Sequence, residues 1–414
     1  MVSRRAFLKA SGLSVVSFGA VPGLLLRAAS AADLRPRGRT LVVLFQRGAC
    51  DGLNVVVPHG EPAYYSARPS IALARPGRGD GATLDLDRFF GLHPALAPLL
   101  PLWSDGRLAA VHAVGSPDPT RSHFDAQDFM ESGTPGRKAT DDGWMNRHLQ
   151  ATPEPGATPL RAVALLPVLP RSLQGKAPAV SLASVADFGV RPAAGPAVAH
   201  GFEGMYDAAV ADALHGAGHE AFAAMRALQA AHPAQQAPAN GAEYPGGALG
   251  NSLRQLAQLI KADLGVELAF AEVGGWDHHV GEGGAQGQLA GRLRELASAL
   301  VAFDRDLGAR MSQVAVVTLT EFGRTVRENG DRGTDHGHGS VSLLVGGGVR
   351  GGRVHGRWPG LRQQDLYEGR DLAVTTDFRD LLGELLTRHL GAHDLGAVFP
   401  GYRVDARRFP GVVS

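Results

Sequence analysis

The sequence has one cysteine, Cys50, among 414 residues, so the chain can form no internal disulfide and no thiolate metal cluster. It also lacks an excess of charge of one sign, because 41 Lys and Arg stand against 40 Asp and Glu. Proteins that bind nucleic acid usually carry a basic patch or stripe, and this balance therefore argues against nucleic acid as a partner. Any metal ion would have to bind histidine, aspartate or glutamate.

The first 31 residues are ordered like a secretory signal, with Arg4 and Arg5 first, an apolar region next, and small residues near Ala31. The apolar region is short and contains Gly and Ser, so we expect no stable membrane span, which needs about 20 apolar residues. Adjacent arginines followed by Phe7 and Leu8 are typical of a twin-arginine signal. We expect the twin-arginine export machinery as a partner and a periplasmic or secreted protein. The alternative is a basic N-terminal helix of a cytoplasmic protein.

The rest of the sequence has the composition of a well-packed globular protein, with 44% hydrophobic and 20% charged residues. Short apolar runs predict strands at 40–45, 107–114, 160–169, 179–182, 266–273, 313–319 and 340–346. Apolar residues at helical spacing predict helices at 94–103, 122–132, 202–231, 249–264, 286–311 and 377–390.

Strands that alternate with amphipathic helices predict an α/β fold, with a mainly parallel sheet and helices on both faces. Residues 150–248 are the least regular part of the sequence and include a run rich in Pro, Ala, Gln and Gly. We expect an irregular cap or insertion there, carried by a single domain that spans residues 32–414.

Polar clusters stand at the ends of five predicted strands, and in open α/β sheets ligands gather at strand ends. Their carboxylates and imidazoles suit a divalent metal ion, which would be zinc, calcium, magnesium or manganese. The candidate metal ligands are Asp51, Asp277, His278, His279, Glu321, His336 and His338. The sequence leaves open which histidine of each close pair faces the site.

Some of these residues also fit ordinary structure. Asp51 followed by Gly52 is typical of a turn, and the run from Asp277 to His279 fits a solvated strand exit. Residues 335–339 are harder to explain in this way, because two histidines lie between glycines and close to carboxylates. This last segment is therefore the strongest single indication of a functional site.

The candidate catalytic residues are Ser122, His123 and Arg324. Ser122 begins a predicted helix, whose N-terminal N–H groups would stabilise an anion or an attacking alkoxide. The alternative is that Ser122 only caps this helix, with Asp125 three residues later as its partner. His123 fits a base, a metal ligand or a surface histidine. Arg324 and Arg121 fit either anion-binding arginines or surface charges.

Five segments together resemble domain-of-unknown-function family 1501, whose members are bacterial and commonly carry twin-arginine signals. These segments are 51–54 (DGLN), 121–126 (RSHFDA), 274–279 (GGWDHH), 320–325 (TEFGRT) and 335–339 (DHGHG). That family is similar in turn to the alkaline phosphatase and sulfatase superfamily, whose members bind metal at strand ends and transfer phosphoryl or sulfuryl groups. The resemblance implies an alkaline phosphatase-like fold.

The resemblance also implies roles for individual residues. Asp51 stands where the superfamily has its first metal-binding Asp, Ser122 near its hydroxyl nucleophile, and Glu321 at the Asp of an Asp-His-Gly motif. Asp277 with His278 or His279 stands near an Asp/His ligand pair, and His336 or His338 near the last His ligand. Phe322 departs from the pattern, because a ligand histidine would be expected there. The departure puts a two-metal site in question and leaves a one-metal or degenerate site.

Together these features predict an exported, metal-dependent hydrolase-like protein that acts on phosphate or sulfate esters, with a small anionic ester as its substrate. In that role the metal would lower the pKa of the Ser122 hydroxyl, and an arginine such as Arg324 would neutralise the transferred group. The alternative is a non-catalytic periplasmic binding or assembly protein that keeps the fold.

Overall fold

The computed structural model describes residues 38–138, 140–154, 156–186 and 212–413. The export signal predicted for the first 31 residues lies outside these ranges. Within the described residues, no helix is long and apolar enough to span a membrane.

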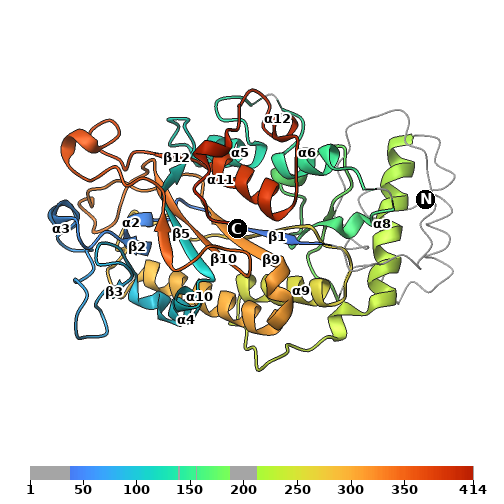
Figure 1. Cartoon of the computed structure of the whole chain (residues 1–414), viewed down its shortest axis with the longest axis horizontal. Helices are drawn as coiled ribbons and strands as arrows, with labels where there is room; N and C mark the ends of the chain where they lie inside the picture. The colour runs from blue at the N-terminus through green and yellow to red at the C-terminus, as the bar shows by residue number, and fades with distance from the viewer. Residues whose placement is uncertain (1–37, 139, 155, 187–211, 414) are drawn as a thin grey trace.

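A nine-stranded sheet forms the centre of the molecule, with the strand order β11-β5-β10-β9-β1-β8-β6-β7 and β12 paired to β5 (Figure 1). Every pairing in it is parallel except the two made by β10, which is antiparallel to both β5 and β9. The strands are β1 (Thr40–Gln46), β5 (Leu108–Gly115), β6 (Ala162–Ala164), β7 (Val180–Ser181), β8 (Leu268–Val273), β9 (Val314–Leu319), β10 (Ser340–Gly346), β11 (Arg353–His355) and β12 (Thr376–Asp377).

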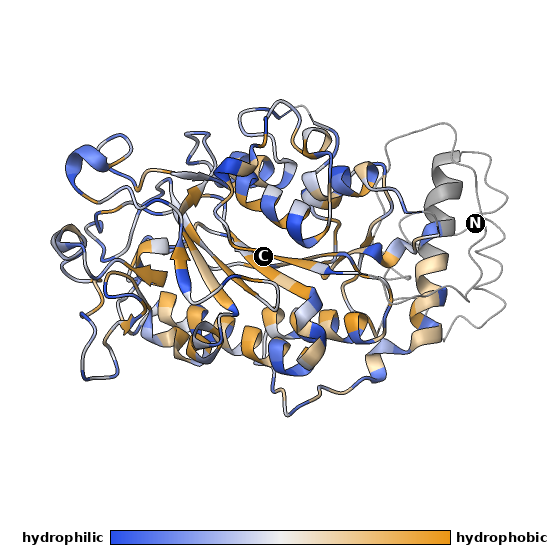
Figure 2. Cartoon of the chain, in the orientation of Figure 1, coloured by the Kyte–Doolittle hydropathy of each residue, from blue (hydrophilic) through white to orange (hydrophobic). Residues whose placement is uncertain are grey.

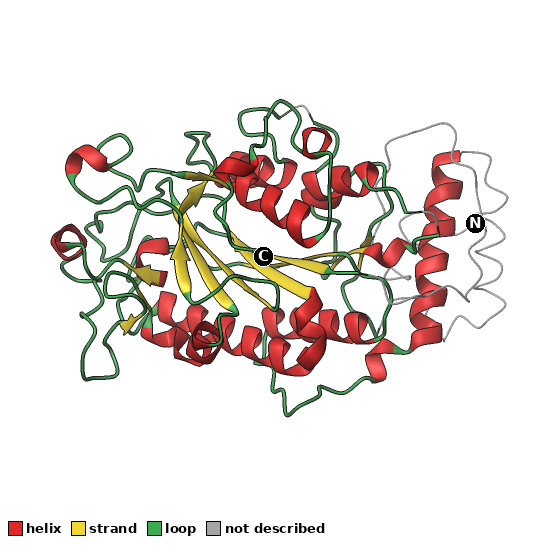
Figure 3. Ribbon diagram, viewed as in Figure 1, coloured by secondary structure: helices red, strands yellow, loops and turns green. Residues whose placement is uncertain are grey.

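Helices cover both faces of this sheet (Figure 3). One face packs against α4 (Leu100–Ser104), α9 (Ala248–Lys261) and α10 (Gln288–Leu307). The other face packs against α5 (His123–Ser132), α6 (Trp144–Ala151), α11 (Phe378–Glu384) and α12 (Leu395–Val398). The remaining described α-helices and the strands of a small second sheet are α2 (Gly52–Val55), α3 (Pro62–Ala67), α8 (Asp212–Ala231), β2 (Val56–Val57), β3 (Leu84–Asp85) and β4 (Gly91–Leu92).

The central strand β1 shows why a continuous apolar run predicts a strand covered on both faces. Successive side chains of a strand point to opposite faces. Val42 and Leu44 pack in the core beneath α9 and α10, whereas Val43 and Phe45 pack in the core beneath α6 and α11. The strands are correspondingly apolar along their length (Figure 2). Burying each such side chain contributes about 1.5 to 3 kcal/mol.

The α/β fold with a mostly parallel sheet and helices on both faces is therefore confirmed. Among the described strands of the main sheet, β10 alone runs against its neighbours. Part of the predicted insertion at 150–248 belongs to the main sheet, because β6 and β7 extend its edge beyond β8.

One edge of the sheet gathers the polar segments of the sequence. The carboxyl ends of β1, β5, β8 and β9 lie at this edge, and so does the amino end of β10, because that strand is antiparallel. The segments that leave or enter the strands there are 47–51, 116–123, 274–279, 320–324 and 333–339. The sheet thus brings together residues that are far apart in the sequence.

Candidate metal site

Three imidazoles and one carboxylate meet at this edge, and we call them the histidine cluster: His123, Asp277, His279 and His336. Nε2 of His336 lies 3.0 Å from Nε2 of His123 and 2.9 Å from Nε2 of His279. The Asp277 carboxylate reaches all three rings, at 3.1 Å from His279, 3.3 Å from His336 and 3.5 Å from His123. The ligand atoms of His123, Asp277 and His336 lie within 4.8 Å of one another and could hold a metal ion.

The hydrogen bonds on the far side of each ring fix the tautomers. Nδ1 of His123 contacts the Glu321 carboxylate at 2.9 Å, and Nδ1 of His279 contacts the Asp335 carboxylate at 3.0 Å. Nδ1 of His336 contacts the backbone carbonyl of Arg121 at 2.9 Å. An ionised carboxylate and a carbonyl can only accept, so each Nδ1 carries a hydrogen, and each Nε2 is left to face the cluster as a potential ligand atom.

Three lone pairs that face one another repel unless a cation lies between them. A proton on one ring would satisfy one contact but would leave the third nitrogen and the carboxylate without a donor. The contacts that involve His336 or Asp277 measure 2.9 to 3.5 Å, close to the edge of about 3.3 Å expected for a tetrahedron with metal–nitrogen bonds of about 2.0–2.1 Å. Ligand histidines also typically donate their other nitrogen to a carboxylate or carbonyl. The donor set therefore fits a single metal ion.

Glu321 orients His123 rather than joining the cluster. One of its oxygens accepts hydrogen bonds from His123, from the Gly48 backbone N–H at 2.8 Å and from Gln127 at 2.8 Å. The Thr320 hydroxyl donates to the other oxygen at 3.1 Å. Burial by itself raises the pKa of Glu321, but the hydrogen bonds from His123 and Gln127 outweigh it and lower the pKa overall. Glu321 is therefore an anion that fixes the His123 ring, and its hydrogen bond raises the pKa of His123.

Arg324 holds the carboxylate of the cluster in place. Its Nη1 donates to Asp277 at 2.6 Å, and its Nε donates to the Thr334 hydroxyl at 3.1 Å. Its side chain is 1% exposed. Burial raises the pKa of Asp277, yet the hydrogen bond from Arg324 lowers it overall. The guanidinium predicted to bind a substrate anion is thus engaged with the protein itself.

Asp51 lies in a buried ion pair instead of the cluster. Both of its carboxylate oxygens accept hydrogen bonds from Arg68, which is completely buried. Glu282 packs against the same carboxylate, and its pKa is raised well above the usual value by burial and by the charge of Asp51. Glu282 accepts a hydrogen bond from the Thr334 hydroxyl at 2.7 Å. Arg68, not a metal ion, is therefore the partner of Asp51 here.

Glycines allow the loops around the cluster to approach closely. Gly48 has a φ of +119°, and a Cβ there would lie 2.7 Å from the Asp277 nitrogen. A Cβ on Gly333 would lie 2.3 Å from the His279 carbonyl oxygen. Any larger residue would push the loop that carries Asp277 and His279 away from its neighbours.

The structure selects one histidine from each pair that the sequence left open. His279 and His336 belong to the cluster, whereas His338 stacks on the ring of Tyr367 with their centres 4.3 Å apart. His278 points elsewhere as well: it is 4% exposed, its Nδ1 has no hydrogen-bond partner among the described residues, and burial lowers its pKa to about 4. His278 is therefore neutral at neutral pH.

Ser122 is the N-terminal boundary residue of α5, directly before the cluster residue His123. Its side chain is exposed and makes no capping hydrogen bond. Asp125, predicted as its capping partner, instead forms an ion pair with Lys138 at 2.5 Å. Phe322 packs against the rings of His123 and His336, with centres 5.0 and 5.1 Å apart. An apolar ring thus borders the cluster where the superfamily pattern would have a histidine.

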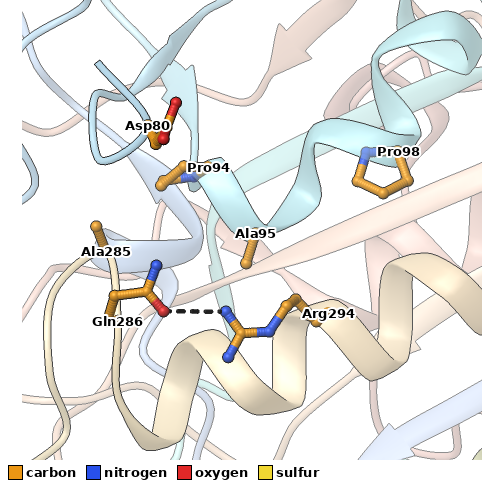
Figure 4. Close-up of a pocket in the computed structure, with 7 residues that line it drawn as sticks. All are labelled: Asp80, Pro94, Ala95, Pro98, Ala285, Gln286 and Arg294. Atoms are coloured by element: carbon orange, nitrogen blue, oxygen red, sulfur yellow. Dashed lines mark hydrogen bonds between the residues drawn. The ribbon is translucent and has the colours of Figure 1, made fainter.

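Two hollows flank the first turn of α10. One has a volume of 440 Å³ and is lined by Asp277, His278 and Arg292 together with Gly275, Gly287, Gln288 and Gly291. The other has a volume of 250 Å³ and is lined by Asp80, Pro94, Ala95, Pro98, Ala285, Gln286 and Arg294 (Figure 4). Only the first reaches a cluster residue.

Sequence reasoning missed three side chains at this site: Gln127, Glu282 and Arg292. Gln127 and Arg292 are polar positions on amphipathic helices, where surface residues have the same pattern. Glu282 stands in a loop without periodicity. The sequence did hold one indication of Arg292. Gly274 and Gly275 precede the two histidines, and such a glycine pair is typical of a backbone segment that another group approaches closely. A Cβ on Gly275 would lie 2.9 Å from Nε of Arg292.

Comparison with known proteins identifies a family but no activity. No curated protein and no solved structure matches the chain. One family model, described as "Protein of unknown function (DUF1501)", matches residues 102–399, which include every member of the histidine cluster. This match covers more than half of the chain, and the chain therefore belongs to the DUF1501 family.

Proposed function

We propose that this protein is a metal-dependent hydrolase of phosphate or sulfate esters that uses one metal ion held by the histidine cluster. The observation that carries the proposal is that the ligand atoms of His123, Asp277 and His336 lie within 4.8 Å of one another. His279 lies beside them, and each of the three rings is held by an acceptor at its Nδ1. Nitrogen and oxygen donors without sulfur favour zinc over the softer metals and over calcium, which prefers oxygen alone.

The bound metal would supply a Lewis acid that polarises an ester oxygen and lowers the pKa of a nearby hydroxyl or water. The chain's own residues prepare this chemistry. Glu321 and Arg324 hold the His123 ring and the Asp277 carboxylate, so that the ligand atoms need no rearrangement. The exposed hydroxyl of Ser122 makes no capping hydrogen bond and lies one residue before His123. This position suits a nucleophile better than a helix cap.

The alternative is a non-catalytic binding or assembly protein that keeps the fold and the metal. Phe322 favours this alternative to the extent that it replaces a second-metal histidine. It does not remove the first site, because one metal ion is enough for hydrolysis in many zinc enzymes. The expected export signal would place either function in the periplasm or outside the cell.

The test combines metal content with turnover. The purified mature protein should contain about one zinc per chain by elemental analysis, and it should hydrolyse at least one ester in a panel of aryl phosphates, phosphodiesters and sulfates. Ser122→Ala should keep the metal and the fold. Loss of turnover in this variant assigns Ser122 as the nucleophile, and full turnover assigns the attack to water.

The outcomes separate the two functions. A chain that binds no metal would refute the proposal outright. A chain that binds metal but hydrolyses none of the esters would leave the binding protein as the function, and Ser122 would then have no catalytic role.

A further inference from the structure

The larger hollow beside α10, which we call the Asp277 hollow, opens next to the histidine cluster because Asp277 lines both. Its volume of 440 Å³ is enough for a small anionic group and part of the molecule that carries it. The groups around it differ from those of the cluster, since most of the other lining residues are glycines or donors of hydrogen bonds.

Positive charge faces this hollow from two sources. Arg292 lies across Gly275, whose lack of a side chain leaves room for the guanidinium. Only one hydrogen bond engages it within the described residues, from Nη1 to Glu295 at 3.2 Å. The second source is the N-terminus of α10, a 20-residue helix whose first turn carries no acidic residue and whose boundary residue Gly287 has no side chain to cap it.

A third group points to a ligand independently of the helix. His278 lines the hollow and is 4% exposed, yet its Nδ1 has no hydrogen-bond partner among the described residues. Buried polar groups are normally satisfied, and an exception calls for an explanation. In the tautomer that carries the single ring hydrogen on Nδ1, this neutral ring would donate it to an oxyanion seated in the hollow.

We infer that the Asp277 hollow binds a tetrahedral oxyanion, the phosphate or sulfate group of the substrate, and that Arg292 is the residue that binds it. The inference deepens the proposed function and rests on it. Without a metal ion the Asp277 carboxylate is offset only by Arg324 and its neighbouring histidines and weakens the binding of an anion, so a cation in the cluster should strengthen it. Binding of the oxyanion is therefore expected to depend on metal.

Two arginines near the hollow have different roles. Arg324 is buried and holds Asp277, whereas Arg292 has a side chain that is 43% exposed and faces solvent in the hollow. Arg294 offers a matched control, because it lies on the same helix two residues later and lines the other hollow. There its Nη1 donates to Gln286 at 3.3 Å (Figure 4).

The experiment measures binding of inorganic phosphate and sulfate by calorimetry, with the zinc-loaded and the metal-stripped protein. The zinc-loaded protein should bind at least one of these anions, and stripping the metal should weaken binding at least tenfold. Arg292→Gln should weaken binding about tenfold or more, the loss expected for one charge-assisted contact, with unchanged zinc content. Arg294→Gln should bind as the parent does.

Equal anion affinity in Arg292→Gln and the parent would overturn the inference, and so would a zinc-loaded parent that binds neither anion. Failure of zinc to bind at all would instead overturn the proposed function. In that case the comparison of Arg292→Gln with Arg294→Gln in the metal-free protein still decides whether the hollow binds the anion, and equal affinity would again overturn the inference.

Discussion

The histidines that the sequence could not distinguish provide the sharpest test of the cluster. We predict that His279→Gln and His336→Gln each lose metal affinity, whereas His278→Gln and His338→Gln keep it. The substitutions are matched in chemistry and lie one or two residues apart in the sequence. Only the first two remove an Nε2 that meets the Asp277 carboxylate at 3.1 to 3.3 Å.

The expected size follows from the number of ligands. Structural zinc sites with four ligands have apparent binding free energies of about 10–16 kcal/mol, so that one ligand accounts for about 2.5–4 kcal/mol. At about 1.4 kcal/mol per tenfold, losing His279 or His336 should weaken zinc binding about 10²- to 10³-fold. For the two controls the change should stay below about tenfold, less than the loss of about 10- to 100-fold typical of an outer-shell residue.

Competition with a chelating zinc indicator at fixed pH measures these affinities directly. Circular dichroism of each variant, without metal, checks that the fold is intact. Equal losses in all four variants would mean that the substitutions act through stability. Loss in His278→Gln with retention in His279→Gln would refute the assignment of the cluster.

Two further predictions concern stability. Asp51→Asn should lower the free energy of unfolding, measured in urea, by about 3 to 5 kcal/mol, because it leaves the buried Arg68 without its anion. The folded variant should still bind zinc. Normal stability with loss of zinc binding would instead make Asp51 a metal ligand. His112, 2% exposed, donates to the Val56 carbonyl, and burial lowers its pKa to about 4. The unfolded chain, with a histidine pKa of about 6.5, then binds the proton first, so stability should fall by up to about 3 kcal/mol as the pH drops from about 6.5 to 4. His112→Gln should lose this part of the pH dependence, and an unchanged slope would contradict it.

The parts of the fold that could be predicted are those with local signals. The apolar runs predicted β1 and β10 almost to the residue, because strands covered on both faces are apolar along most of their length. The antiparallel direction of β10 could not be predicted in the same way. Direction depends on the path of the loop from 320 to 339 across the sheet edge, and its glycines permit more than one path.

In the candidate site, too, some features could be predicted from the sequence and others could not. Its location follows from the sheet, since the ends of parallel strands meet at one edge. The choice between His278 and His279 does not, because neighbouring residues on an extended backbone point in opposite directions and sequence gives no preference for either. Asp51 shows another limit of prediction from sequence. A carboxylate after a strand can pair with a metal ion or with an arginine equally well. Arg68 follows the end of α3, where no periodic pattern in the sequence indicates that it reaches Asp51.

The buried ion pair and the histidine cluster are linked, and the link accounts for the charged groups that are buried beside this candidate metal site. Arg68 pairs with Asp51, Asp51 lies against Glu282, and Glu282 accepts from Thr334. The Thr334 hydroxyl in turn accepts from Arg324, which holds Asp277.

The ion pairs and hydrogen bonds between Arg68 and Asp51 and among Glu282, Thr334, Arg324 and Asp277 offset much of the cost of burying these groups. An isolated Arg324 would be free to turn toward an anion in solution and to release Asp277. Held through Thr334 and Glu282, it keeps Asp277 against the three imidazoles. This leaves the more exposed Arg292 as the arginine that is able to meet a substrate.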